Sequence, residues 1–470
     1  MRIRRCAVLF LEPREEVAFD LESLLTGGAG LRRTRRWLAL AAHLDAEVEV
    51  TLEQRELLGR LSPGEWSETD TLNAGDAALV PELIDSGLVI AEEEGHADDP
   101  VRGDEGRTGH PVRDDGRPRT DGPVRDGGES RTRHRERDDV LRAGHWWPPA
   151  AMMHRLARWE GLDSVVSMEA NELTTAADLR RKLGPPPPHV REYGDADDRV
   201  PLPHVEGNAF DAMLARRATC RNFDGERALP LALCAHMLQR VFAARARVRV
   251  DDDTVFLKKN TPSGGGLHPT EAYLIVRNVE GLAPGLYHYH PVDHALTPLP
   301  APAEPLDRFA LRALAGQHWF SDAPVLAVLV PRYARSFWKY RRHAKAYRAL
   351  VLDSGHLSQT LYLSATELGL GAFVTSAINE VDIERGFGLD PLTEGPLAVC
   401  GFGWRAREMT TSEFDPAEEI WLHGAETEME VEAEAEGGER TAPPAGDVPA
   451  DASDDVPDDV PDDTPGNALG

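Results

Sequence analysis

The chain has 470 residues, 41% of them hydrophobic, which is enough apolar material for a sizeable core and too long for one compact domain. The formal net charge is −28, and the stretch after Gly424 holds 15 Asp or Glu residues against one Arg. This acidic balance argues against general nucleic-acid binding.

The sequence also argues against a metal site and a membrane anchor. Its four cysteines, Cys6, Cys220, Cys234 and Cys400, are widely spaced, and no Cys/His cluster has the spacing of metal ligands. The apolar stretch near the N-terminus is too short for a signal peptide, and no run of about 20 apolar residues predicts a membrane helix. We therefore expect buried free thiols in a cytoplasmic protein without a metal.

Residues 1–95 have the pattern of a small α/β or winged-helix-like domain. Strands are predicted over 6–12 and 16–21, and helices over 35–44 and 52–61. Residues 79–94 then predict a helix, a turn at Asp85–Gly87 and a short strand, an order common in winged helices. A module of this kind has either a peptide-recognition role or a purely structural or dimer-supporting role, and the sequence leaves both open.

Two segments connect this domain to the rest of the chain. Residues 96–143 repeat a PVRD theme and hold almost no large apolar residues, so we expect a flexible linker. Residues 144–205 begin with the helical stripe HWWPPAAMMHRLARWEGL and contain the stiff run PPPP at 185–188. We interpret them as a connecting segment that packs on the main domain, with its Trp and Met side chains in the core.

Residues 206–423 mix helical and strand patterns, as in an α+β sandwich. Buried strands are predicted at AYLIV (272–276), VLAVLVPRY (325–333) and GPLAVCGFG (395–403), and a further strand at LYHYH (286–290). Residues 347–370 predict a long central helix that ends at Gly369–Gly371. From 424 to 470, alternating glutamates and VPDD repeats predict a disordered acidic tail.

The stretch 261–291, TPSGGGLHPTEAYLIVRNVEGLAPGLYHYHP, resembles the flavin loop of SagB-type dehydrogenases over a long match without gaps. These are FMN-dependent enzymes of the nitroreductase superfamily that oxidise modified peptides during ribosomal peptide maturation. Successive glycines also suit a flat or anionic ligand, because the backbone can approach it closely. The resemblance implies a nitroreductase-like FMN-binding fold, with a central, mostly antiparallel sheet flanked by helices. It assigns flavin contacts to Pro262, Ser263, Gly264 and Gly265.

Other motifs agree with this resemblance. ARRATCRNFD at 215–224 gathers arginines around a hydroxyl, which suits a phosphate, and resembles the motif that holds the flavin phosphate in nitroreductases. The segment 369–390 resembles the one whose backbone N–H faces flavin N5, and GFGWR at 401–405 resembles the last core strand with its basic residue. By position, the resemblance assigns FMN contacts to Arg217, Thr219, Arg221, Thr375, Ser376, Ala377 and Arg405, with Arg407 as a rival of Arg405.

The resemblance implies Lys339 and Tyr340 as catalytic residues, because FWKYRRHAKAYRALVLDSGH at 337–356 resembles a Lys-Tyr region that acts in azoline-oxidising relatives. A lysine can remove a ring proton if burial lowers its pKa, and a tyrosine can donate or relay one. A basic surface helix is the alternative interpretation. We expect His268 to pack in a turn, and Asp353 and His356 to fix the start of the helix.

The resemblance as a whole implies an FMN-dependent oxidoreductase that works as a homodimer with flavin at the subunit interface. Its substrate would be a modified precursor peptide, oxidised for example from azoline to azole, and a cyclodehydratase complex would be a further partner. Two alternatives stay open. One is an NAD(P)H-dependent nitro- or quinone reductase, and the other is a flavin-less scaffold that binds the precursor peptide through the N-terminal module.

Overall fold

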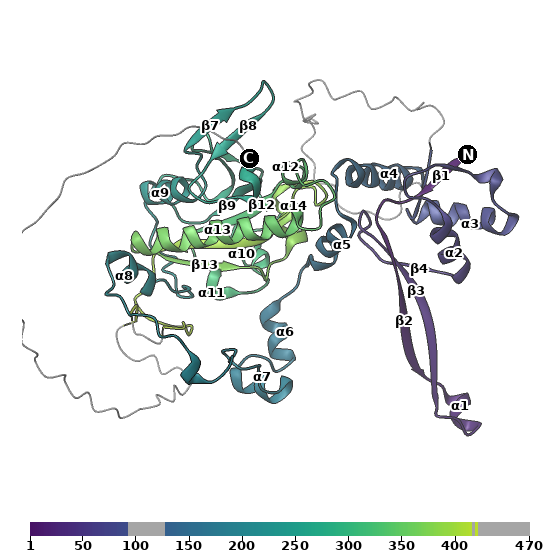
Figure 1. Ribbon diagram of the computed structural model, residues 1–470, viewed down its shortest axis with the longest axis horizontal. Helices are drawn as coiled ribbons and strands as arrows, with labels where there is room; N and C mark the ends of the chain where they lie inside the picture. Colours follow the sequence, from purple (N-terminus) through teal and green to yellow (C-terminus); the bar gives the residue numbers. More distant parts are fainter. Residues whose placement is uncertain (93–126, 416–418, 422–470) are drawn as a thin grey trace, which may run out of the picture. The chain divides into compact units, whose positions relative to one another are not determined.

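The computed structural model describes residues 1–92, 127–415 and 419–421 (Figure 1). Residues 1–92 contain two three-stranded antiparallel sheets, ordered β5-β1-β6 and β2-β3-β4, together with helices. The elements are β1 (Arg2–Arg5), β2 (Leu9–Phe19), α1 (Leu21–Leu25), β3 (Leu31–Ala41), β4 (Val48–Val50), α2 (Leu52–Arg60), β5 (Ser67–Glu68), α3 (Ala74–Asp85) and β6 (Val89–Ala91). A small N-terminal sheet domain is therefore present.

The helix predicted over 35–44 is wrong, because this segment belongs mostly to strand β3. It pairs with β2 from Leu31↔Phe19 to Ala41↔Leu9, and with β4 on its other edge. Pairing on both edges satisfies the backbone hydrogen bonds of the segment, and this outweighs the local helical spacing. The two strands predicted over 6–12 and 16–21 fall largely within the single strand β2.

The flexible linker predicted over 96–143 is wrong for its last part, because residues 127–143 form helix α4 (Gly127–Ala143). Opposite charges one turn apart support this helix, as in the ion pair between Arg142 and Asp138. The rest of that linker, and the acidic tail predicted over 424–470, lie outside the described residues.

The connecting segment contains α5 (Pro148–Ala157), α6 (Ser164–Ala170) and α7 (Ala176–Leu183). Trp146 and Met152 are buried, whereas Met153 and Trp159 are exposed, so the expected burial of the Trp and Met side chains holds only in part. Trp146 shares an apolar cluster with Tyr333, Phe337 and Leu350 of the main domain. Residues 185–208 are exposed along almost their whole length. The predicted packing therefore holds for the region around α5 and is wrong for the stretch that includes the PPPP run, where proline-rich extended backbone has few apolar side chains to bury.

The main domain contains a six-stranded antiparallel sheet with strand order β11-β10-β9-β12-β14-β13. Its strands are β9 (Thr270–Val276), β10 (Gly285–His290), β11 (Ala295–Pro298), β12 (Val325–Pro331), β13 (Gly371–Thr375) and β14 (Ala398–Gly403), and β7 (Ala246–Arg249) pairs separately with β8 (Val255–Lys258). Its helices are α8 (Ala209–Ala215), α9 (Leu231–Val241), α10 (Leu306–Ala313), α11 (His318–Ser321), α12 (Tyr333–Phe337), α13 (Ala346–Glu367) and α14 (Glu380–Phe387). The strands predicted at AYLIV, LYHYH, VLAVLVPRY and GPLAVCGFG are confirmed, and so is the long central helix, which is α13.

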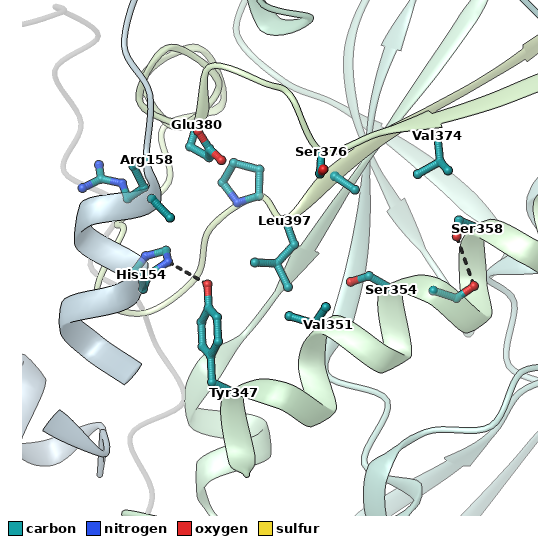
Figure 2. Close-up of a pocket in the computed structure, with 14 residues that line it drawn as sticks. His154, Arg158, Tyr347, Val351, Ser354, Ser358, Val374, Ser376, Glu380 and Leu397 are labelled. Carbon is teal, nitrogen blue, oxygen red and sulfur yellow. Dashed lines mark hydrogen bonds between the residues drawn. The ribbon is translucent and has the colours of Figure 1, made fainter. Parts of the chain in front are cut away.

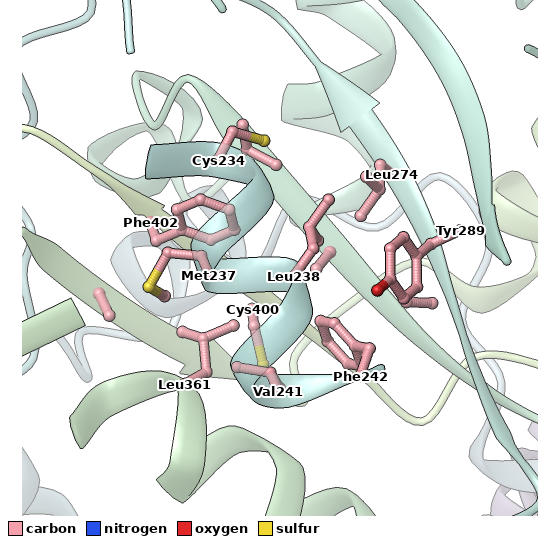
Figure 3. Close-up of a cluster of buried hydrophobic side chains, with 14 of the residues drawn as sticks. Cys234, Met237, Leu238, Val241, Phe242, Leu274, Tyr289, Leu361, Cys400 and Phe402 are labelled. Atoms are coloured by element: carbon pink, nitrogen blue, oxygen red, sulfur yellow. The ribbon is translucent and has the colours of Figure 1, made fainter. Parts of the chain in front are cut away.

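Alternate residues of the central strands face opposite sides of the sheet and build two cores. The core on the side of α9 and α13 includes Leu238, Leu274, Leu361, Cys400 and Phe402 (Figure 3). The core on the side of α10 and α14 includes Ile275, Phe309, Val328, Ile383 and Val399. The sheet is thus covered by helices on both faces, as the predicted nitroreductase-like fold requires.

All four cysteines are buried free thiols, as predicted, and burial raises the pKa of Cys234 to about 12. In the ranges that the structure describes, no cluster of three or more His, Cys, Asp or Glu side chains could hold a metal ion. None of the helices in this described part of the chain has the length and apolar character needed to cross a membrane.

Gly401 on β14 lies opposite Phe373 on β13, and the aromatic ring covers the place where a side chain would begin. A Cβ at position 401 would lie 2.1 Å from Phe373 Cε1, and that ring is already stacked on Phe320 with 3.9 Å between the ring centroids. Because the ring cannot move away freely, we expect Gly401→Ala to lower the free energy of unfolding by about 1–3 kcal/mol in urea denaturation.

The matched control is Gly285→Ala on β10, where a Cβ would lie 3.8 Å from Tyr287 Cε2, an ordinary contact distance. Equal losses of stability in the two variants would contradict the steric explanation.

Candidate functional site

A cavity of about 380 Å³ lies between α5, α13, the segment that follows β13 and the loop before β14 (Figure 2). It is lined by His154, Ala157, Arg158, Tyr347, Val351, Ser354, Gly355, Ser358, Val374, Ser376, Glu380, Pro396, Leu397 and Ala398. Small side chains at Ser354, Gly355 and Ser358 leave space beside α13. The volume falls within the range of about 300–1,000 Å³ that is usual for small-molecule sites.

One row of residues on α13 connects this cavity to the predicted phosphate motif. Ser354, Ser358 and Tyr362 follow one another at helical spacing and share a face. The Tyr362 hydroxyl lies 2.9 Å from Thr219 Oγ1 and accepts the backbone N–H of Val374 at 3.1 Å. Arg217 lies over the Tyr362 ring at 5.4 Å and forms no salt bridge within the described residues. The structure thus brings Arg217 and Thr219 next to the segment that begins at Val374.

The predicted flavin-N5 segment lies at the edge of the same cavity. Ser376 lines the cavity and is exposed. Its neighbours are held in place, because Thr375 Oγ1 donates to Gln317 Oε1 at 3.1 Å and accepts the backbone N–H of Ala377 at 3.2 Å. Gln317 also donates to the carbonyl of Ala377 at 2.6 Å, so this one side chain binds the residues on both sides of Ser376, Thr375 through its hydroxyl and Ala377 through its backbone.

Sequence reasoning missed the wall that α5 and α14 contribute to the cavity. Arg158 pairs with the carboxylate of Glu384, with 2.9 Å between Nε and Oε1. Glu380 Oε2 accepts the backbone N–H of Trp159 at 2.8 Å. Burial raises the pKa of Glu380 to about 7, and the nearby charge of Glu384 acts in the same direction. The cavity therefore contains a carboxyl group that can exchange a proton near neutral pH.

His154 belongs to the same wall and is a neutral hydrogen-bonding group. Burial lowers the pKa of its imidazole to about 3. Its Nε2 lies 3.0 Å from the carbonyl oxygen of Pro391, which can only accept, so Nε2 carries the proton. Nδ1 then accepts from the Tyr347 hydroxyl at 3.2 Å (Figure 2).

The predicted glycine loop is anchored to another face of α13. Asp353 accepts the Ser263 hydroxyl at 2.5 Å and the backbone N–H of Gly264 at 3.0 Å. Gly265 and Gly266 have φ angles of 65° and 69°, a left-handed conformation that favours glycine. The expectation that Asp353 and His356 fix the start of the helix is wrong, because α13 begins at Ala346 and both residues lie about two turns or more further on.

The predicted catalytic pair contacts this loop rather than the cavity. A Cβ at Gly265 would lie 2.7 Å from the Tyr340 hydroxyl and 3.0 Å from Lys339 Nζ. Lys339 is exposed and Tyr340 is half-buried. Within one chain, the structure therefore joins Pro262, Ser263, Gly264 and Gly265 to Lys339 and Tyr340, but it does not bring them to Ser376.

His268 follows the glycine loop and packs in a turn, as expected. Its backbone N–H donates to Ser263 Oγ at 2.9 Å. Burial, with Lys259, Lys258 and Arg335 nearby, lowers the pKa of its imidazole to about 4, so the ring is neutral at pH 7.

The two remaining predicted phosphate residues converge on Glu413. The Arg405 guanidinium pairs with this buried carboxylate and donates to the carbonyl of Ala218 at 3.3 Å. The backbone N–H of Arg221 donates to the same carboxylate at 2.6 Å, and the Arg221 side chain reaches the carbonyl of Ser412. Arg405 thus has a structural partner already, whereas Arg217 has its guanidinium free of any described carboxylate.

Residues 214–404 match the model of the nitroreductase family. The Methanocaldococcus jannaschii protein MJ1384, which is named as a nitroreductase, is 31% identical over 204 residues that cover 43% of this chain and 95% of that protein. Trifolitoxin-processing protein TfxB of Rhizobium leguminosarum bv. trifolii is 30% identical, with 30% of this chain and 39% of that protein covered. Microcin B17-processing protein McbC of Escherichia coli is 28% identical, with coverage of 31% and 54%.

Among solved structures, the E. coli microcin synthetase McbBCD complex with truncated pro-MccB17 bound contains a chain that is 21% identical, with a TM-score of 0.40 and coverage of 56% of this chain and 92% of that one. The relation to MJ1384 spans nearly the whole of that relative, whereas the match to TfxB and McbC spans about half of each protein or less. The family match and this coverage show that the chain belongs to the nitroreductase family of oxidoreductases.

Proposed function

We propose that this chain is an FMN-dependent dehydrogenase that oxidises a post-translationally modified ribosomal peptide, for example from azoline to azole. The observation that carries the cofactor proposal is the row along α13 that joins the cavity to Arg217 and Thr219 through Tyr362. The peptide substrate is supported by the similarity to two proteins named for the processing of trifolitoxin and microcin B17.

The residues in place fit FMN. A free guanidinium and a hydroxyl at Arg217 and Thr219 suit its phosphate, because both can donate to phosphate oxygens. The cavity beside Ser354 and Ser358 has room for a flat ring, and Ser376 lies at its edge. When bound, FMN would supply a two-electron acceptor. The protein itself would hold the ring against α13, exclude water from the cavity and position the side chains that donate or accept protons.

A homodimer is supported by the way in which α13 divides the site. Successive residues are rotated by about 100°. Asp353 therefore faces the glycine loop, Ser354 and Ser358 face the cavity, and Leu352 projects between these two faces with 57% of its surface exposed. A second copy packed on this exposed face would bring its glycine loop, with Lys339 and Tyr340, towards the cavity of the first.

We expect the purified protein to bind FMN, and Arg217→Ala to weaken this binding about 10- to 100-fold, because charged hydrogen bonds to the phosphate are lost. The dissociation constant is measured by flavin fluorescence titration. Arg216→Ala is the matched control, since Arg216 is the exposed neighbour of Arg217. Equal affinities for FMN in both variants would show that Arg217 does not bind the phosphate. A wild type that takes up no FMN would favour the alternative of a flavin-less scaffold.

We expect the wild type to be a dimer by light scattering, and Leu352→Arg to dissociate it, because a charged side chain would have to be buried in the contact. The variant should also bind FMN more weakly, since the site would lack the partner's glycine loop. Leu25→Arg is the control, because Leu25 is exposed far from α13 in the sequence. A Leu352→Arg protein that remains dimeric would place the interface elsewhere.

The reaction is tested anaerobically with the FMN-loaded protein and a synthetic peptide that carries one thiazoline ring. We expect the flavin absorbance to bleach and the peptide to lose two hydrogens, which mass spectrometry detects. Bleaching by NADH, together with none by the peptide, would favour the nitro- or quinone reductase instead.

A further inference from the structure

We propose that Glu380 is the residue that accepts the substrate's proton in the cavity beside α13. This inference rests on the proposed dehydrogenation and adds a role that the sequence motifs did not assign. It depends on where Glu380 lies, on what its two carboxylate oxygens contact and on how its charged neighbours are paired.

Glu380 lines the cavity four residues after Ser376, at the first position of α14 (Figure 2). The backbone N–H of Trp159 holds its Oε2 at 2.8 Å. Only backbone N–H groups, those of Trp159 and of Glu380 itself, donate hydrogen bonds to this carboxylate within the described residues, and it has no ion pair there. The carboxylate is thus held by the backbone and has no side-chain partner, so it can still accept a proton from a ligand in the cavity.

The charged and titratable groups around Glu380 leave it as the unpaired carboxyl of this wall. On α14, Glu384 is paired with Arg158, and Asp382 is held by the backbone N–H of Gly161 at 2.7 Å and by Arg312 at 3.6 Å. The remaining neighbours are neutral at pH 7, because burial lowers the pKa of His154 and raises that of Tyr347. Burial also raises the pKa of Glu380 to about 7, which suits a group that must take up and release protons at neutral pH.

The oxidation of an azoline requires such an acceptor. Two C–H bonds of the ring break and a C=C bond forms. FMN, when bound, would accept one hydrogen with its electron pair, and the other hydrogen leaves as a proton. A carboxylate at Glu380 takes this proton, becomes a neutral acid and later releases it to solvent. In the proposed homodimer, Lys339 and Tyr340 of the second copy, at its glycine loop, would offer hydrogen-bond donors that suit the heteroatoms of the ring.

The first test needs neither cofactor nor substrate. In an infrared pH titration of the flavin-free full-length protein, we expect a carboxylic acid signal that disappears with a midpoint near pH 7. This signal should be missing in Glu380→Gln and present in Glu160→Gln, which changes an exposed carboxylate. The same titration curve in the wild type and in Glu380→Gln would overturn the inference without touching the proposed function.

The second test separates proton removal from a structural role. The FMN-loaded protein is mixed anaerobically with the thiazoline peptide or with NADH, whose hydride transfer requires no C–H proton to be removed. We expect Glu380→Gln to slow bleaching by the peptide on the order of 100-fold or more, and far more than it slows bleaching by NADH. The wild-type rate with the peptide should rise as pH increases through about 7, and the variant should lose this rise.

Three other outcomes contradict the inference. If Glu380→Gln slows the peptide and NADH equally, Glu380 is structural and the inference fails. If the variant matches the wild type with the peptide, the proton goes elsewhere and the dehydrogenation still stands. If the peptide does not bleach the wild type while NADH does, the proposed function fails, and the proton-accepting role fails with it.

Discussion

Helix α13 presents four faces to four different environments, and the rest of the site depends on keeping these faces in register. Leu350, Leu357 and Leu361 are buried in apolar clusters. Ser354 and Ser358 border the cavity, and Asp353 binds the glycine loop. The face that carries Leu352 is exposed. Because successive side chains on a helix point in fixed directions, each of these groups must keep its spacing. The helix therefore fixes the loop and the cavity relative to each other.

The central strands and α13 could be predicted from the sequence because their patterns are long and consistent. Strand β12 is buried at every position, so its continuous apolar run was informative by itself. Strand β3 could not be predicted in this way. Its apolar residues mimic helical spacing, and its conformation is decided by the two strands that pair with its edges. The same limit applies to α4, whose mixed charges look like a linker until the i,i+4 pairing in the structure is seen.

The candidate site was only partly visible in the sequence, for a related reason. The glycine loop and the arginine motif are local patterns, so a resemblance could identify them. Glu380 is unremarkable in its own segment. Its hydrogen bond comes from the backbone N–H of Trp159, 221 positions earlier in the chain. Asp353 was misread because its partners, Ser263 and Gly264, are also distant in sequence. Long-range contacts of this kind have no local signature.

The contribution of α5 separates what this chain shares with its family from what is its own. The family model matches residues 214–404, whereas His154 and Arg158 lie well before that range. The matched segment supplies the sheet, the glycine loop and Arg217. The wall of the cavity beside Glu380 is formed by α5 and the residues that follow it, which the match does not cover. The environment of a carboxyl group decides whether it holds its proton at neutral pH. Residues outside the family match therefore hold Glu380 through the backbone N–H of Trp159 and pair Arg158 with Glu384, on a fold that the family shares.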